Sequence, residues 1–411
     1  MKIFYTIVLV ICSVPVFSQN IEDYLSRCQY QQAIDYLEQQ NDTSRVAEMQ
    51  KVLCYNSLQN YPKAIDILLN LQEKYPEDPQ IKIQLALGYN NLSMVPESIK
   101  YFGELIKMDS ANIYFLKQMA FCLEKTNQMD SAKVYFNRIL EIDPTDQKAK
   151  EELIKIEINL ENYAEALDIT DRFLVGDTNN IQLNILRALG YYYMDNYKVA
   201  IESFEKCRLL GDTSLTVNKY LGVSYFYSNQ NKKAYPFLVK AYEQDSTNNS
   251  VLYALATVNK DLENFPEAIR LYTQLIRKAV PPDIALYSYY KSLADSYNDN
   301  KEVEPAIYFY KKALNYYTNY QDMELLFIIA DLYDLHVHDY GLAVDYYKQY
   351  RESLTRYGEF LAKQDSENQD NANQAITTSI SDKIKYLDER ITYLEDKIEK
   401  SNLEKNDNNA K

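Results

Sequence analysis

The sequence predicts an all-α solenoid, in which helical hairpins stack one after another and a separate C-terminal helix follows. Three observations predict this class: a 34-residue period, a scarcity of turn-forming residues, and a heptad pattern near the C-terminus. The 411 residues include only 8 glycines and 11 prolines, too few for the many tight turns of an all-β fold. A hydrophobic content of 46% is enough for a packed core and argues against wholesale disorder.

The first eighteen residues have the pattern of a secretory signal peptide. Lys2 precedes an apolar run over residues 3–17, and Ser18 supplies a small residue before the expected cleavage. The apolar run is shorter than the roughly 20 residues of a spanning helix. We therefore expect residues 1–18 to be removed, giving a periplasmic or secreted protein without direct membrane insertion. An uncleaved anchor and lipidation at Cys12 are the alternatives.

A 34-residue period organises most of the chain. A small residue, nearly always alanine, recurs at this spacing: Ala64, Ser98, Ala132, Ala166, Ala200, Ala234 and Ala268. The residues twelve positions earlier are also mostly small, and those four positions later are mostly large. Because i, i+4 and i+7 share one helix face, each alanine marks an apolar stripe on the second helix of a hairpin. Polar turns, several containing asparagine and proline, separate the two helices.

Two helices per 34 residues with these small and large positions resemble the tetratricopeptide repeat. The motifs that carry the resemblance are Leu87-Gly88-Tyr89, Leu189-Gly190-Tyr191, Ala200-Ile201-Glu202-Ser203-Phe204 and Asp143-Pro144. The resemblance implies a right-handed superhelical solenoid over residues 19–352, with about nine units and an N-terminal partial one around Ala33. Some features depart from the family: the chain has no tryptophan, and Glu157 and Thr170 occupy usually apolar positions of the fourth repeat.

The tail beyond the repeats changes character. Residues 353–375 are expected to hold the end of the last helix and a flexible polar linker. Residues 376–403 carry a seam of isoleucine and leucine at alternating spacings of 4 and 3: Ile380, Ile384, Leu387, Ile391, Leu394 and Ile398. Isoleucine at a and mainly leucine at d favour a parallel two-stranded coiled coil. Residues 404–411 are expected to form a disordered tail.

Charges beside the seam fit a parallel homodimer. In that arrangement Lys383 would face Asp388 of the partner subunit, and Arg390 would face Glu395 of the partner subunit. Roughly three heptads are marginal in isolation. Three arrangements therefore stay open: a homodimer, a helix folded back on the solenoid as a cap, and attachment to a different coiled-coil protein.

Charge and motif content argue against nucleic acid binding and catalysis. A net charge of −15 repels phosphate backbones. No GxSxG, HExxH, Walker-type or GxGxxG pattern occurs. The chain has two histidines, in His336-Val337-His338, which we expect to be ordinary turn residues, with metal binding as the alternative. The sequence therefore predicts no enzymatic activity, no cofactor and no metal.

Four cysteines follow the signal peptide, and their spacings match neither a zinc site nor a CxxC redox pair. These are Cys28, Cys54, Cys122 and Cys207. We expect each to be an unpaired thiol buried at a helix-packing position.

The resemblance implies that the first helix of each hairpin lines a concave groove that can hold a peptide. The candidates in the fifth and sixth repeats are Ile185, Leu189, Tyr192, Tyr193, Lys219, Val223, Phe226 and Tyr227. Asn56 and Asn90 are candidates to bond a peptide backbone. The pattern with which some family members clamp a C-terminal carboxylate is missing, since Phe121 and Lys155 stand where asparagine is needed. With 40 tyrosines in the chain, packing between repeats is the alternative role for these rings.

These features together predict a non-enzymatic scaffold or adaptor. It would bind a protein or peptide through the groove, in the periplasm or cell envelope, and self-associate through the tail. A structural oligomer built by solenoid stacking is the alternative. A carbohydrate-binding protein is a further one, which the aromatic groove allows and the missing tryptophan does not support.

Overall fold

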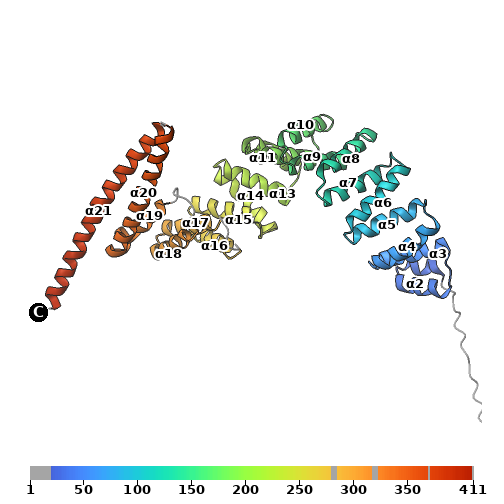
Figure 1. The fold of residues 1–411 in the computed structure, drawn as a ribbon, viewed down its shortest axis with the longest axis horizontal. Coiled ribbons are helices and arrows are strands. Elements are labelled where there is room, and N and C mark those ends of the chain that lie inside the picture. Colours follow the sequence, from blue (N-terminus) through green and yellow to red (C-terminus); the bar gives the residue numbers. More distant parts are fainter. Residues whose placement is uncertain (1–19, 279–284, 317–322, 369–370, 410–411) are drawn as a thin grey trace, which may run out of the picture. The chain divides into compact units, whose positions relative to one another are not determined.

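The computed structural model describes residues 20–278, 285–316, 323–368 and 371–409, and over these ranges it is helical with no strand (Figure 1). The α-helices are α1 (Ile21–Ser26), α2 (Tyr30–Gln39), α3 (Arg45–Ser57), α4 (Tyr61–Lys74), α5 (Pro79–Asn91), α6 (Val95–Met108), α7 (Ile113–Lys125), α8 (Met129–Ile142), α9 (Gln147–Asn159), α10 (Tyr163–Leu174), α11 (Ile181–Tyr193), α12 (Tyr197–Leu209), α13 (Leu215–Tyr227), α14 (Asn231–Gln244), α15 (Asn249–Asp261), α16 (Phe265–Lys278), α17 (Ala285–Asp299), α18 (Val303–Leu314), α19 (Glu324–Leu332), α20 (Tyr340–Asn368) and α21 (Asn371–Asn409). A π-helical turn, η2 (Tyr333–Val337), follows α19 directly.

The predicted hairpin stack is confirmed within the described ranges. Nine hairpins follow one another from α3/α4 to α19/α20, and the short α1 with α2 forms the partial N-terminal unit. None of the described helices is both long and apolar enough to cross a membrane. The signal peptide expected at residues 1–18, with Cys12, lies outside the described residues.

The chain divides within α11 into two compact units, Met1–Leu186 and Arg187–Lys411. Each unit has its core along the predicted alanine stripe, and the stripe residues are fully buried together with the large residues that follow them. In the first unit these include Ala64, Ser98, Ala132, Phe102 and Phe136, and in the second Ala200, Ala234, Ala268, Phe204 and Tyr272. The small and large positions therefore alternate in the core as the period predicts.

Close helix contact explains why some of these positions must stay small. A Cβ atom added at Gly222, on α13, would lie 3.0 Å from the backbone nitrogen of Leu238 on α14. Gly103 on α6 differs, because a Cβ atom added there would have Met119 Cε as its nearest neighbour, at 3.6 Å, which is an ordinary van der Waals contact. Gly222 is thus required for packing, whereas Gly103 is not.

Each of the first seven hairpin turns contains one non-glycine residue in the left-handed region, again at a 34-residue spacing. These residues are Gln59, Ser93, Asn127, Glu161, Asp195, Asn229 and Glu263, with φ between 56 and 63°. The next residue's N–H bonds to a carbonyl five positions earlier, as from Asn60 to Tyr55 at 2.8 Å and from Asn264 to Asn259 at 2.8 Å. This is the Schellman arrangement that ends a helix. It ends the first helix of each hairpin at the same place in the repeat.

Glu157 and Thr170, the polar residues at usually apolar positions of the fourth repeat, are buried, and both have hydrogen-bond partners. Glu157 is 1% exposed, forms an ion pair with Lys133 at 2.5 Å and accepts a hydrogen bond from Asn162 at 3.0 Å. The hydroxyl of Thr170 donates to the Ala166 carbonyl at 2.5 Å. The apolar pattern is broken here without leaving a polar group unpaired.

The tail differs from the predicted linker and disordered end. Helix α20 runs through Asn368 and α21 begins at Asn371, so residues 364–368 and 371–375 are helical, as are 404–409. Residues 369–370 lie outside the described ranges. The segment is polar but contains neither glycine nor proline, and polarity alone does not end a helix whose neighbouring turns are held by packing.

Candidate functional site

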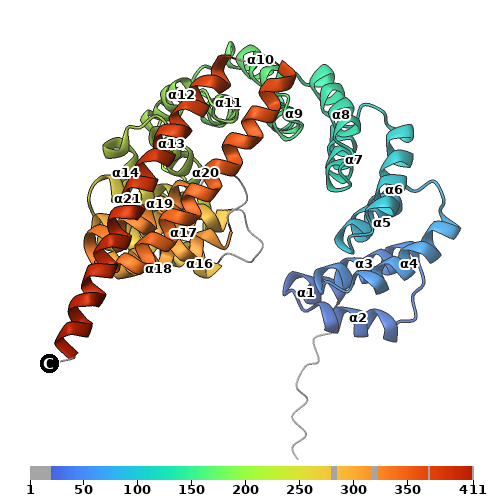
Figure 2. The same cartoon turned by 60° about the vertical axis from the view of Figure 1, so that its left-hand side comes forward.

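Helix α21 lies along α20 of the same chain (Figure 2). The residues of the predicted coiled-coil seam are part of the core that the two helices share. Ile380, Leu387, Ile391 and Leu394 are buried, and Ile384 and Ile398 pack partly buried against the same core. This core also contains Leu325 and Ile329 of α19 and Tyr347 and Leu354 of α20. The structure therefore has the capping arrangement among the three that the sequence left open.

Ion pairs hold α21 in place. Lys383 Nζ lies 2.6 Å from Glu324 Oε1 on α19, and Arg390 Nη2 lies 2.7 Å from Asp334 Oδ2 on η2. Two further pairs join α20 to α21: Arg351–Asp388 at 2.5 Å and Lys348–Glu395 at 2.7 Å. The four charges expected to pair across a dimer thus each have a partner within the chain, because α19, η2 and α20 present the opposite charges to α21.

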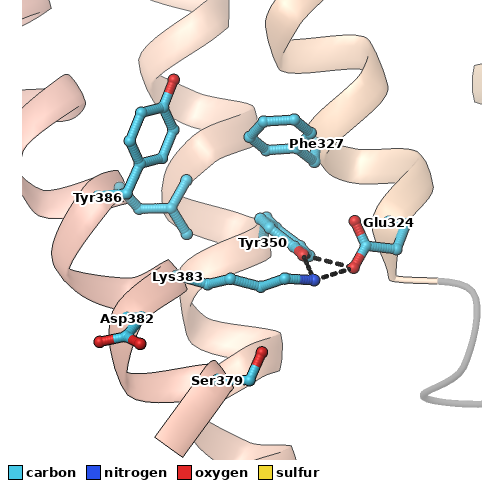
Figure 3. A pocket seen from close by; sticks show the side chains of 8 residues that line it. Glu324, Phe327, Tyr350, Ser379, Asp382, Lys383 and Tyr386 are labelled. Carbon is cyan, nitrogen blue, oxygen red and sulfur yellow. Dashed lines mark hydrogen bonds and ion pairs between the residues drawn. The ribbon is translucent and has the colours of Figure 1, made fainter.

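A pocket of about 340 Å³ opens between α19, α20 and α21 (Figure 3). Its lining is mostly apolar and aromatic, with one group of polar side chains: Glu324, Phe327, Tyr350, Ser379, Asp382, Lys383, Tyr386 and Leu387. The Phe327 and Tyr350 rings are 5.5 Å apart, and Tyr386 is 51% exposed. In Figure 3 the Lys383 side chain extends from α21 to Glu324, the Tyr350 hydroxyl lies beside both groups, and Asp382 points away from the ammonium.

Glu324 is the centre of the polar group. Its Oε1 accepts from Lys383 Nζ at 2.6 Å and from the Tyr350 hydroxyl at 2.8 Å. Partial burial raises the pKa of Glu324, but these two hydrogen bonds outweigh burial and hold its pKa below the ordinary value. Burial and the Glu324 carboxylate raise the pKa of Tyr350. Glu324 is therefore ionised, and Tyr350 is a neutral donor, at neutral pH.

A cluster of aromatic rings on α11, α13 and α12 forms the second candidate site. Tyr192 lies 5.3 Å from Tyr193 and 4.8 Å from Tyr220 between ring centroids, and the Tyr193 and Tyr220 hydroxyls are 3.0 Å apart. Tyr197, at the start of α12, stacks on Tyr227 at 5.0 Å. We call these five residues, with Phe226, the aromatic ridge. Burial and the neighbouring tyrosines raise the pKa of Tyr192 to about 12, so its hydroxyl stays protonated.

The structure separates the predicted groove residues into exposed and buried ones. Tyr193 and Tyr227 are 40% and 51% exposed, and four others are half-buried: Leu189, Tyr192, Lys219 and Phe226. Ile185 and Val223 are buried in the core, so their assignment to the groove surface was wrong. Helices α11 and α13 pack against other helices on more than one side, so only a narrow strip of each helix remains for a groove surface.

Sequence reasoning missed three aromatic residues of this region. Tyr220 contacts the rings of α11, and Tyr253 on α15 lies 6.4 Å from Phe226 and extends the contacts toward Tyr289 of α17. Tyr197, at the start of α12, is the third. The sequence held a signal that could have identified two of them. Tyr220 follows Tyr193 by 27 residues, and Tyr253 follows Phe226 by the same number.

Asn56 and Asn90 lie in the first unit and already have partners on the next first helices of the stack. The Asn56 side-chain amide donates to Gln84 at 3.1 Å, and Asn90 accepts from Lys125 at 2.8 Å. A peptide N–H that reached Asn90 Oδ1 would compete with Lys125 for this oxygen. The Asn56 Oδ1 atom differs, because it is buried and has no hydrogen-bond partner within the described residues.

The histidines and cysteines complete the set of residues singled out in the sequence. His336 and His338 are exposed at η2 and the following turn, and His338 Nδ1 is 3.1 Å from the Asp334 carbonyl. Among the described residues no group of three side chains is arranged to hold a metal ion. Cys54, Cys122 and Cys207 are buried thiols outside any disulfide, as predicted, and burial raises the pKa of Cys207 to about 11. Cys28 is exposed in the turn between α1 and α2, so the prediction of burial was wrong there.

Comparisons with known proteins give matches to the repeat region. The family model of intraflagellar transport protein 56 matches residues 48–234, somewhat less than half of the chain. No curated protein sequence matches. The solved structures include a tetratricopeptide repeat protein from Parabacteroides merdae ATCC 43184, with 16% identity over 67% of this chain and 98% of that one and a TM-score of 0.40.

Two further solved structures show the same level of similarity. MamA from Desulfovibrio magneticus RS-1 has 17% identity over 42% of this chain and 98% of that one, with a TM-score of 0.37. YrrB, described as a TPR protein with an unusual peptide-binding site, has 16% identity over 55% of this chain and 94% of that one, with a TM-score of 0.33. At these identities and TM-scores no function is transferred from either protein. The hairpin stack, the 34-residue period and the buried small positions make the chain a tetratricopeptide-type repeat solenoid.

Proposed function

We propose that the chain is a non-catalytic scaffold that binds a peptide segment of another protein at the aromatic ridge. The observation that carries the proposal is the exposure of Tyr193 and Tyr227, 40% and 51%, beside half-buried rings that hold them in place. Large aromatic side chains seldom remain exposed in a connected group unless a partner covers them. The ridge thus offers rigid rings with hydroxyl groups, which suits an extended or helical peptide.

The neighbouring contacts favour a preformed surface. Tyr197 donates a hydrogen bond to Asp195 at 2.5 Å and stacks on Tyr227, and the Lys219 ammonium lies 4.7 Å from the centre of the Tyr220 ring. These contacts restrict the rings before any partner arrives, which lowers the entropic cost of binding. The lysine adds one positive charge beside the rings.

The place of action is the periplasm or the cell envelope in this proposal. Its support is the pattern of residues 1–18, a basic start followed by an apolar run and a small residue. N-terminal sequencing of the protein recovered from the source cells tests it. A chain that starts at Gln19 agrees with export, and one that still starts at Met1 contradicts it.

Self-association through the tail is a second part of the proposal, supported by the heptad seam. Since the seam residues are packed on α20, a dimer would form when two copies exchange their α21 helices. Light scattering over a wide range of protein concentration tests this part. A mass that rises to twice that of one chain supports exchange, and a monomer at all concentrations removes it.

Site-specific photocrosslinking tests the ridge. A benzophenone amino acid replaces Tyr227 in one variant and Tyr75, a 42% exposed tyrosine that follows α4, in a matched control. We expect a discrete adduct with another protein from position 227 and none from position 75, and we expect Tyr193→Ser to reduce it. Equal adducts from both positions, or none from position 227 in source-cell extract, would contradict the proposal.

A further inference from the structure

We propose that the pocket between α19, α20 and α21 binds an aromatic group that carries a hydrogen-bond donor, namely the indole or phenol side chain of a partner protein. This site is separate from the aromatic ridge. Its volume of about 340 Å³ is near the lower end of the roughly 300–1,000 Å³ of known ligand pockets. It therefore fits one large side chain.

The walls favour an aromatic occupant. Phe327 of α19 and Tyr386 and Leu387 of α21 provide ring and aliphatic surface around the opening, and Figure 3 shows Tyr386 and Phe327 on the same side of the Lys383 side chain. Rings at these positions can contact an inserted ring edge-to-face or stacked. A flat ring fills such a space with little loss of rotational freedom.

The polar end of the pocket selects a neutral donor. Both hydrogen bonds to Glu324 end on Oε1, and within the described part of the chain no side chain donates to its Oε2. In Figure 3 this second oxygen lies on the side of Phe327, away from the Lys383 ammonium. The lowered pKa of Glu324 keeps the carboxylate charged, so Oε2 is a strong acceptor for an N–H or O–H group.

Other ligand chemistries fit less well. A purely aliphatic group would cover the Glu324 carboxylate without replacing the water that solvates it. A ligand carboxylate would be repelled by Glu324. A ligand cation would approach the Lys383 ammonium, which is already 2.6 Å from Glu324. An indole or phenol combines an apolar body with a donor at its edge and avoids all three costs.

The composition of the chain provides a direct assay. Because the protein has no tryptophan, indole fluorescence reports only an added indole. The probe is N-acetyltryptophanamide at fixed concentration, and the protein is the chain from Gln19 to Lys411, added up to millimolar concentration. We expect the emission to move to shorter wavelength as the indole leaves water. The N1-methylated analogue, which lacks the donor, should bind roughly ten-fold more weakly, the loss of one hydrogen bond to a charged group.

Two serine variants locate the binding. Ser379→Phe fills the pocket without removing the Lys383–Glu324 pair, and we expect it to abolish the shift. Ser401→Phe makes the same substitution at an exposed position farther along α21 and should leave the shift unchanged. Circular dichroism melts establish that both variants fold.

The results separate this proposal from that for the ridge. Tyr227→Ser should bind the probe as the unaltered chain does. The pocket proposal is overturned if the unaltered chain gives no shift, if the methylated probe binds as tightly as its parent, or if Ser379→Phe retains binding. None of these outcomes changes the expectation for photocrosslinking at Tyr227.

Discussion

Arg390→Leu should release α21 from the end of the solenoid. Arg390 is the main partner of Asp334, which is 3% exposed. The guanidinium donates to Asp334 Oδ2 through Nε at 2.8 Å and approaches the same oxygen through Nη2 at 2.7 Å. Tyr347 is the other neighbour, but its hydroxyl lies 2.5 Å from Asp331 and 3.3 Å from Asp334. A hydroxyl has one hydrogen, so Asp334 depends on Arg390.

The magnitude follows from the burial of the two charges. Removing one partner of a fully buried ion pair costs about 3–5 kcal/mol, because it leaves an uncompensated charge. Arg390 keeps 28% of its side chain exposed, so water can partly replace it. We expect α21 docking to weaken by about 2–3 kcal/mol, which corresponds to a roughly 30- to 150-fold increase in the opened population.

Hydrogen exchange of the α21 backbone measures this opening directly. A global unfolding curve is less suitable, because repeat arrays often unfold in more than one step. Amides at 380–398 should exchange faster in Arg390→Leu by the factor given above, while those of α13 and α15 stay unchanged. Lys348→Ala is the matched control on the same interface. Its pair with Glu395 is half exposed on both sides and should contribute at most about 1 kcal/mol.

A second substitution, at Asp334, tests whether the uncompensated carboxylate causes the opening of α21. If the uncompensated carboxylate drives opening, Arg390→Leu combined with Asp334→Asn should recover much of the lost protection, since a neutral amide is less costly to bury. Unchanged exchange in Arg390→Leu would refute the reasoning. A double variant as open as the single one would show that lost packing of the arginine stem is responsible.

Three further outcomes follow from the packing described above. Gly222→Ala should destabilise the chain by about 1–3 kcal/mol through overpacking, whereas Gly103→Ala should stabilise it by about 0.5–1 kcal/mol; urea melts that rank them the other way would refute the contact argument. Glu161→Gly should gain about 1 kcal/mol by relieving a left-handed backbone, and Glu165→Gly, inside α10, should lose a similar amount. A thiol reagent at about pH 8 should modify Cys28 rapidly and the three buried cysteines only after denaturation; more than one fast thiol in a chain starting at Gln19 would contradict the burial.

Periodicity predicted the hairpin stack because it reports on packing that recurs at each repeat. The alanine stripe from Ala64 to Ala268 determines which helix faces meet, and the structure buries every member. The same reasoning did not find the left-handed turn residues such as Glu161, since side chains of several polar types occupy that position. Their common feature is a backbone conformation, which residue type reports only weakly outside glycine and asparagine.

The tail and the sites were predicted less completely, for a different reason. A heptad seam specifies that one helix buries Ile380 and Leu387 against another, but it does not say whether the second helix belongs to the same chain. The choice depends on Glu324 and Asp334, whose charges meet α21 only after the last hairpin has formed. Likewise Tyr193 was found from its position in the repeat, whereas the pocket joins α19 and α21 across some 60 residues and has no local pattern.

The stack of neighbouring hairpins also has a consequence for the order in which the chain acquires its structure. Helices contact mainly those adjacent in sequence, so the loops that must close are short and folding can start at any hairpin. As the chain emerges from a ribosome or a translocation channel, early hairpins can form before later ones exist. The final hairpin is the exception, because its apolar face and the carboxylate of Asp334 stay uncovered until α21 arrives. The interval before α21 docks is therefore when we expect the nascent chain to depend most on chaperones.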